Sequence, residues 1–68
     1  MVNWKNLVDK NTGTVKNFAL GKLSGRSFYG RFAGTEVGGE VRQLLRENGV
    51  KYARRLARKA LRRRNLLQ

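Results

Sequence analysis

The strongest functional signal in the sequence is a run of cationic side chains between residues 51 and 64. Its members are Lys51, Arg54, Arg55, Arg58, Lys59, Arg62, Arg63 and Arg64. No Asp or Glu lies between residues 51 and 68. Because the arginine guanidinium presents a planar fork of N–H donors that fits phosphate oxygens, this composition favours a polyanion as partner. We therefore expect these eight side chains to bind the phosphates of a nucleic acid.

The charge of the whole chain supports the same expectation. The sequence has 16 Lys and Arg against 4 Asp and Glu, a formal net charge of +12. A field of this size attracts nucleic acids, acidic membranes or acidic proteins. Outside the run, Lys22, Arg26 and Arg31 are expected to make secondary phosphate contacts. Phosphate neutralisation releases counterions, so we expect salt-sensitive binding that is largely independent of base sequence, with DNA favoured over RNA.

The residue types that are missing argue against an enzyme or a metalloprotein. The chain has no His and no Cys, and its four carboxylates are scattered along the sequence. The usual groups for proton transfer and nucleophilic attack are therefore absent, as are the ligands of an ordinary zinc site. No glycine-rich phosphate loop followed by Lys-Ser or Lys-Thr occurs. We expect no catalysis, no metal and no cofactor.

The basic run is predicted to be a helix over residues 50–66. It is rich in Ala, Leu and Arg, and the chain contains no Pro. On a helical projection one side collects the apolar residues Tyr52, Ala53, Leu56, Ala57, Ala60, Leu61 and Leu67. Most of the cations fall on the other side, whereas Arg63 and Arg64 rotate into the apolar arc. Packing is therefore expected to end near Leu61, with Arg63 and Arg64 reaching beyond the folded body.

A second helix is predicted over residues 36–48, because Val37, Val41, Leu44 and Leu45 recur at helical spacing. Two consecutive glycines, Gly38 and Gly39, weaken its first turn by about 1 kcal/mol each relative to Ala and place its start nearer Glu40. The pair Asn48-Gly49 predicts a break between the two helices, since glycine adopts the left-handed conformation at helix ends.

The glycine-rich N-terminal half is predicted to be irregular or to contain a small β-hairpin. The sequence Asn-Thr-Gly-Thr at residues 11–14 is typical of a turn between two short apolar segments. Residues 27–32, bounded by Gly25 and Gly34, are a candidate for a further strand. The expected fold class is thus mainly α, with an aromatic and glycine-rich anchoring segment at residues 1–34 and a basic helical segment at residues 35–68, both within one small domain.

Apolar side chains are expected either to build a miniature core or to dock on another protein. They are Trp4, Phe18, Phe28, Tyr29, Phe32, Val41, Leu44, Leu45, Leu56 and Leu61. A chain of 68 residues buries little apolar surface, and neither a disulfide nor a zinc ion can reinforce this one. A protein partner or self-association is therefore expected to contribute to stability.

The order of elements in the second half resembles the ribbon-helix-helix repressor family. Residues 28–32 read Phe-Tyr-Gly-Arg-Phe, a helix ends at Arg46-Glu47-Asn48-Gly49, and a second helix follows. The resemblance covers just over half of the chain. It implies a dimer whose paired strands enter the major groove of DNA, with phosphate contacts near the start of the second helix.

Several functions remain open from the sequence. We favour a small genome-packaging or architectural protein of a virion or nucleoid. The chain combines short length and extreme charge with a glycine-rich segment able to follow an irregular surface and aromatic side chains available to anchor on a shell protein. The alternatives are a repressor-like DNA-binding dimer, a cationic amphipathic helix on a membrane surface, and a basic face that only meets water. No signal peptide and no membrane span are expected, so the predicted location is the cytoplasm or a virion.

Overall fold

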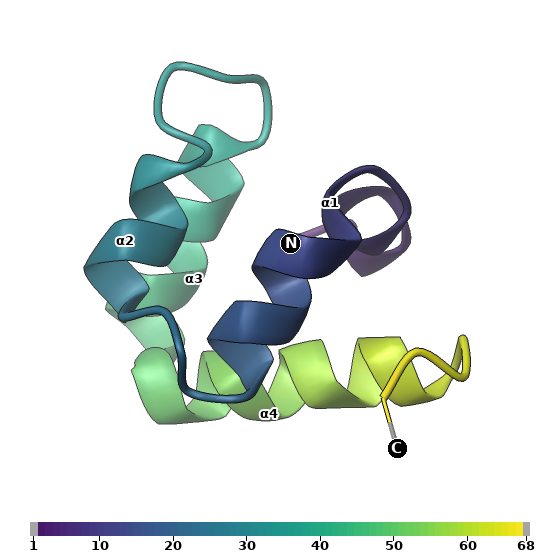
Figure 1. Ribbon diagram of the computed structural model, residues 1–68. Helices are drawn as coiled ribbons and strands as arrows, with labels where there is room; N and C mark the ends of the chain where they lie inside the picture. Colours follow the sequence, from purple (N-terminus) through teal and green to yellow (C-terminus); the bar gives the residue numbers. More distant parts are fainter. Residues whose placement is uncertain (1, 68) are drawn as a thin grey trace.

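The computed structural model describes residues 2–67, which form four α-helices and no strand (Figure 1). The helices are α1 (Trp4–Ala19), α2 (Gly25–Gly30), α3 (Gly38–Asn48) and α4 (Val50–Arg62). α2 and α3 lie side by side and are joined by a loop, and α4 runs across the base of the molecule (Figure 1). α1 packs mainly on α4, while α2 bridges α1 and α3. Both halves of the sequence therefore contribute to one core.

The β-hairpin expected in the N-terminal half is wrong, because residues 4–19 are two helical segments, together labelled α1, that meet at a kink. The predicted turn is only a kink, at which Asn11 alone leaves the helical conformation with φ −139° and ψ 43°. At the kink the Thr12 hydroxyl donates a hydrogen bond to the Val8 carbonyl oxygen at 2.6 Å, a contact that often accompanies a bend in a helix. The buried residues of α1 are Leu7, Val8, Val15, Phe18 and Ala19. Leu7 and Val8 lie before the kink and the other three after it, so both segments of α1 bury apolar side chains in the core.

The strand proposed for residues 27–32 is also wrong, since most of this segment belongs to α2. Ser24 caps the helix by accepting a hydrogen bond from the Ser27 backbone N–H at 3.0 Å. One turn apart, Phe28 and Phe32 are both buried, and the Phe28 ring stacks on Phe18 with centroids 4.0 Å apart. The ribbon that the repressor resemblance requires is therefore absent from residues 2–67.

The aromatic and aliphatic side chains gather in one hydrophobic cluster. Of the predicted packing residues, the cluster buries Phe18, Phe28, Phe32, Val41, Leu44 and Leu61, and Trp4, Tyr29, Leu45 and Leu56 pack against it partly exposed. The core also contains side chains that the sequence did not single out for packing, namely Val2, Leu7, Val8, Val15 and Ala19. These all precede α2, so the N-terminal segment forms much of the core itself.

The two ends of α4 are set by residues in left-handed conformations. The predicted break is confirmed at Gly49, where φ is +86°. The helix ends at Arg62, four residues before the predicted limit, because Asn65 adopts φ +57°. The Leu66 N–H then donates to the Leu61 carbonyl and the Asn65 N–H to the Arg62 carbonyl, both at 3.0 Å. This pattern is a Schellman turn, which satisfies helix-terminal carbonyl groups.

α3 begins at Gly38, before the predicted start near Glu40. The backbone of Gly38 is buried against that of Phe32, and a Cβ atom at this position would collide with the Phe32 carbonyl group. The neighbouring Gly39 is exposed, and a Cβ there would meet nothing within 4 Å. The first glycine is thus required by close backbone packing, whereas the second is not.

This difference gives a matched pair of variants. We expect Gly38→Ala to lower the free energy of unfolding by about 1–3 kcal/mol through overpacking. In contrast, Gly39→Ala should raise it by about 0.5–1 kcal/mol, because alanine restricts the unfolded chain and favours a helix. Urea denaturation followed by circular dichroism measures both. Equal effects of the two variants would contradict the packing described for Gly38.

Candidate nucleic-acid interface

α4 has a narrow apolar face that packs on α1. Ala53, Ala57, Ala60 and Leu61 are buried and fall within an arc of about 100° on the helical projection. Because three of these four side chains are short, the backbones of the two helices can approach closely. This leaves most of the circumference of α4 outside the core.

The opposite side of α4 carries a row of exposed cations, which we call the cationic stripe. It consists of Lys51, Arg55, Lys59, Arg62 and Arg63. The first four fall within about 80° on the helical projection, and Arg63 follows them at the end of the helix. None of these five side chains makes a hydrogen bond or ion pair with another residue between 2 and 67. The stripe is therefore accessible to an anionic partner.

Two of the predicted phosphate ligands, Arg54 and Arg58, point instead at the C-terminus of α1. The Arg54 Nε and Nη2 atoms donate hydrogen bonds to the carbonyl oxygens of Phe18 and Leu23, each at 3.1 Å. Arg58 Nη1 donates to the Ala19 carbonyl at 3.1 Å. The Arg54 guanidinium also lies 5.2 Å from the centre of the Phe18 ring. Both side chains are half-buried, so they hold α4 against α1.

The hydrogen bonds from Arg54 and Arg58 stabilise the C-terminus of α1. A Schellman turn closes the helix, with Gly21 at φ +83° and the Lys22 N–H donating to the Asn17 carbonyl at 2.8 Å. The carbonyl groups of a helix's last turn carry a partial negative charge that favours cations. The guanidinium groups of Arg54 and Arg58 supply both the charge and the additional N–H donors.

Arg64 was predicted to reach beyond the folded body, and this prediction is wrong. Arg64 Nε lies 3.6 Å from a carboxylate oxygen of Asp9 on α1, and this is the one ion pair among residues 2–67. Its Nη1 atom donates to the Ala60 carbonyl at 2.9 Å. Arg64 thus folds back onto α1, whereas Arg63 beside it is exposed.

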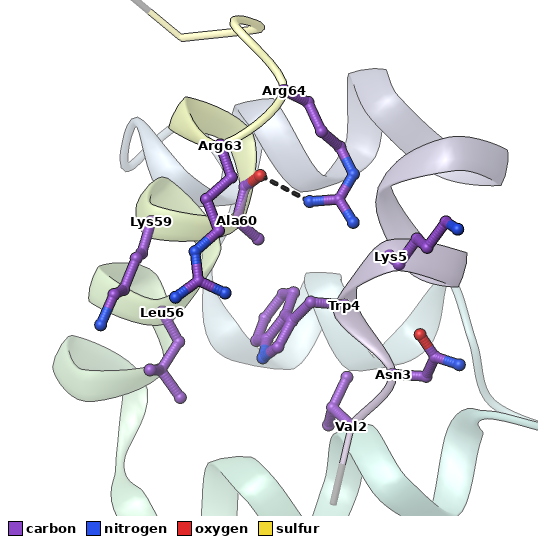
Figure 2. Close-up of a pocket in the computed structure, with 9 residues that line it drawn as sticks. All are labelled: Val2, Asn3, Trp4, Lys5, Leu56, Lys59, Ala60, Arg63 and Arg64. Atoms are coloured by element: carbon purple, nitrogen blue, oxygen red, sulfur yellow. Dashed lines mark hydrogen bonds between the residues drawn. The ribbon is translucent and has the colours of Figure 1, made fainter.

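A pocket lies between the start of α1 and the end of α4 (Figure 2). It has a volume of about 620 Å³ and is lined by Val2, Asn3, Trp4, Lys5, Leu56, Lys59, Ala60, Arg63 and Arg64. Figure 2 shows the indole of Trp4 projecting toward Leu56 of α4 and toward Arg63, which follows the helix. The lining combines an apolar floor with cationic side chains from both helices and contains no acid. We call it the Trp4 pocket.

The secondary contacts predicted for Lys22, Arg26 and Arg31 are spread over different surfaces. Lys22 is exposed in the turn after α1. Arg26 lines a hollow with Arg42 and Arg46 of α3, beside the start of α4. Arg31 lies at the other end of α2, where it lines a different hollow together with Lys10 and Glu36. The structure therefore brings Arg26 toward α4 but not Arg31.

Sequence reasoning missed four cations that border these hollows, namely Lys5, Lys10, Arg42 and Arg46. Arg42 and Arg46 are one helical turn apart on α3, so their spacing was a visible signal. Lys5 reaches the Trp4 pocket only because α1 packs on α4, and no local pattern in the sequence indicates this.

Comparison of the chain with family models, with curated proteins and with solved structures gave no significant match. Among residues 2–67, no three side chains of His, Cys, Asp or Glu are grouped so that they could hold a metal ion. Within the same residues, no helix combines the length and the apolar character needed to cross a bilayer.

The role of Arg54 can be tested against its exposed neighbour. We expect Arg54→Met to lower the free energy of unfolding by about 1–3 kcal/mol, because the α1 carbonyl groups lose charged donors while the aliphatic stem is kept. The same change at Arg55 should alter it by less than about 0.5 kcal/mol. Urea titrations of both variants measure this, and equal losses would contradict the assignment of Arg54 to the fold.

Proposed function

We propose that this protein is a non-enzymatic nucleic-acid-binding protein that holds phosphates on the cationic stripe of α4. The observation that carries the proposal is the stripe itself: five exposed Lys and Arg side chains with no partner among residues 2–67 and no acid in the helix. An exposed helix that only met water would gain from Glu at i,i+4 positions, which α4 lacks. Its uncompensated charge is better explained by a polyanion that neutralises it.

The length of the stripe supports contact with a nucleic-acid backbone. From Lys51 to Arg63 the chain rises by roughly 18 Å at 1.5 Å per residue. One strand of B-DNA carries about five phosphates over that length along its axis. Five cations and about five phosphates are therefore matched in number, which favours neutralisation of the backbone over recognition of isolated anions.

The chemistry of the stripe favours binding that is independent of sequence. α4 contains no Asn or Gln, the side chains that read adenine, and phosphate contacts carry no sequence information directly. We therefore infer a packaging or architectural role, in which a cytoplasmic or virion-associated protein neutralises a genome, with DNA favoured over RNA. The repressor-like alternative is not retained, since residues 2–67 lack the strand that would enter the groove.

A salt titration with random duplex DNA tests the proposal. Each phosphate contact contributes about 0.9 to the slope of log affinity against log salt. We expect Arg55→Gln to reduce the magnitude of the slope by about that amount. The control Arg31→Gln removes the same charge at the end of α2 away from α4 and should change the slope much less.

Two outcomes would contradict the proposed function. One is a slope that Arg55→Gln leaves unchanged, which would place the phosphates elsewhere on the protein. The other is negligible binding to DNA combined with tight binding to vesicles of phosphatidylcholine and phosphatidylglycerol. That result would favour the membrane-surface alternative.

A further inference from the structure

We infer that the Trp4 pocket accepts one unpaired nucleobase, stacked on the indole, with the adjoining phosphates held by Lys5, Lys59 and Arg63. This inference rests on the proposed nucleic-acid binding and makes it more specific. It distinguishes a single strand, or an unpaired position in a folded strand, from a continuous duplex.

The apolar part of the pocket suits the face of a base. Trp4 is partly exposed, whereas the three Phe rings of the chain are buried in the core. Val2, Leu56 and Ala60 complete an apolar lining beside the indole (Figure 2). Aromatic side chains next to cations are the usual platform for single-stranded nucleic acids, because every base offers a flat face for stacking. The volume of about 620 Å³ lies within the range of small-molecule pockets.

The polar part of the pocket suits phosphate. Arg63 extends toward the indole, whereas Lys5 of α1 and Lys59 of α4 line opposite rims of the pocket with their ammonium groups directed outward (Figure 2). None of the three is paired with another residue between 2 and 67. Arg64 also lines the pocket, but it is engaged with Asp9 and the Ala60 carbonyl. Lys59 and Arg63 belong to the cationic stripe as well. A strand held on the stripe would therefore pass directly over the Trp4 pocket.

The surface on the other side of Trp4 is negatively charged. A second hollow, which shares Val2, Trp4 and Leu56 with the pocket, is bordered by Glu40 and Glu47 of α3. These two carboxylates repel phosphate, so the path of a strand past the indole is confined to the side of α4. Stacking on Trp4 and contact with the stripe thus require the same orientation of the ligand.

A duplex cannot use the pocket in the same way. Its bases are paired and stacked inside the helix, so only the backbone is available to the three cations. Base stacking would therefore make the protein prefer single strands over duplexes of equal length and charge, beyond the electrostatic attraction common to both.

Trp4 is the single Trp of the chain, so its fluorescence reports on the pocket directly. We would titrate the protein at one salt concentration with a twelve-nucleotide single strand, an abasic strand of equal length and a twelve-base-pair duplex. The base-bearing strand should quench Trp4 strongly, and the abasic strand and the duplex should quench it little. Poly-glutamate and anionic phosphatidylcholine/phosphatidylglycerol vesicles serve as polyanions without bases.

Variants provide a second readout through the anisotropy of labelled strands. Trp4→Leu should weaken binding of the single strand about tenfold, while binding of the abasic strand and the duplex should change less than about twofold. Trp4→Phe should restore most of the loss, since it keeps an aromatic face. Circular dichroism checks that each variant stays helical, and the fluorescence of the unaltered protein decides the question if Trp4→Leu unfolds.

The outcomes separate this inference from the proposed function. If abasic and base-bearing strands quench equally and bind equally with a steep salt slope, base stacking is wrong and nucleic-acid binding stands. If poly-glutamate or vesicles quench as strongly as the base-bearing strand, the pocket binds another class of anion and the inference is overturned. If no strand binds at all, both proposals fail.

Discussion

The contact between the alanine face of α4 and α1 is the constraint on which the rest of this structure depends. It closes the core over the aromatic rings, and it directs the cationic stripe outward. It also brings Lys5 and Trp4 beside Lys59 and Arg63. The stripe repels itself by a few tenths of a kcal/mol for each pair of like charges at i,i+4 spacing. Burial of the opposite face, together with the hydrogen bonds of Arg54 and Arg58, offsets that repulsion.

Arginines on one helix thus have two separate tasks. Arg54 and Arg58 flank the apolar face, where their long stems lie along it and their guanidinium groups reach the end of α1. The cations further round the helix make no hydrogen bond or ion pair with another residue between 2 and 67 and remain exposed. The position of each cation relative to the alanine face decides whether it stabilises the fold or is available to a ligand. A count of positive charges therefore overstates the binding surface of such a helix.

Part of this arrangement could be predicted from the sequence. The alanine and arginine pattern indicated α4 and its outward charge, and Gly49 indicated the break before it, because these signals are local. The hydrogen bonds of Arg54 and Arg58 to the end of α1 were not predictable in this way. Their acceptors Phe18 and Ala19 lie 36 and 39 residues earlier in the chain. α1 was missed because residues 11–14 have strong turn preferences, which the structure satisfies with a kink between two helical segments and not with a hairpin. The Trp4 pocket depends on the packing of two distant helices.

The dependence of the core on α4 has a consequence for folding during translation. The ribosome delivers α1, α2 and α3 before α4, at about 5–20 residues per second. Helix–coil relaxation takes about a microsecond, but a kinked helix of 16 residues is only marginally stable until its packing partner emerges. Until then the α1 surface that Ala53 and Ala57 later cover stays open to solvent and to chaperones. The time for which this nascent chain remains incompletely folded is thus set by translation and not by the speed of helix formation.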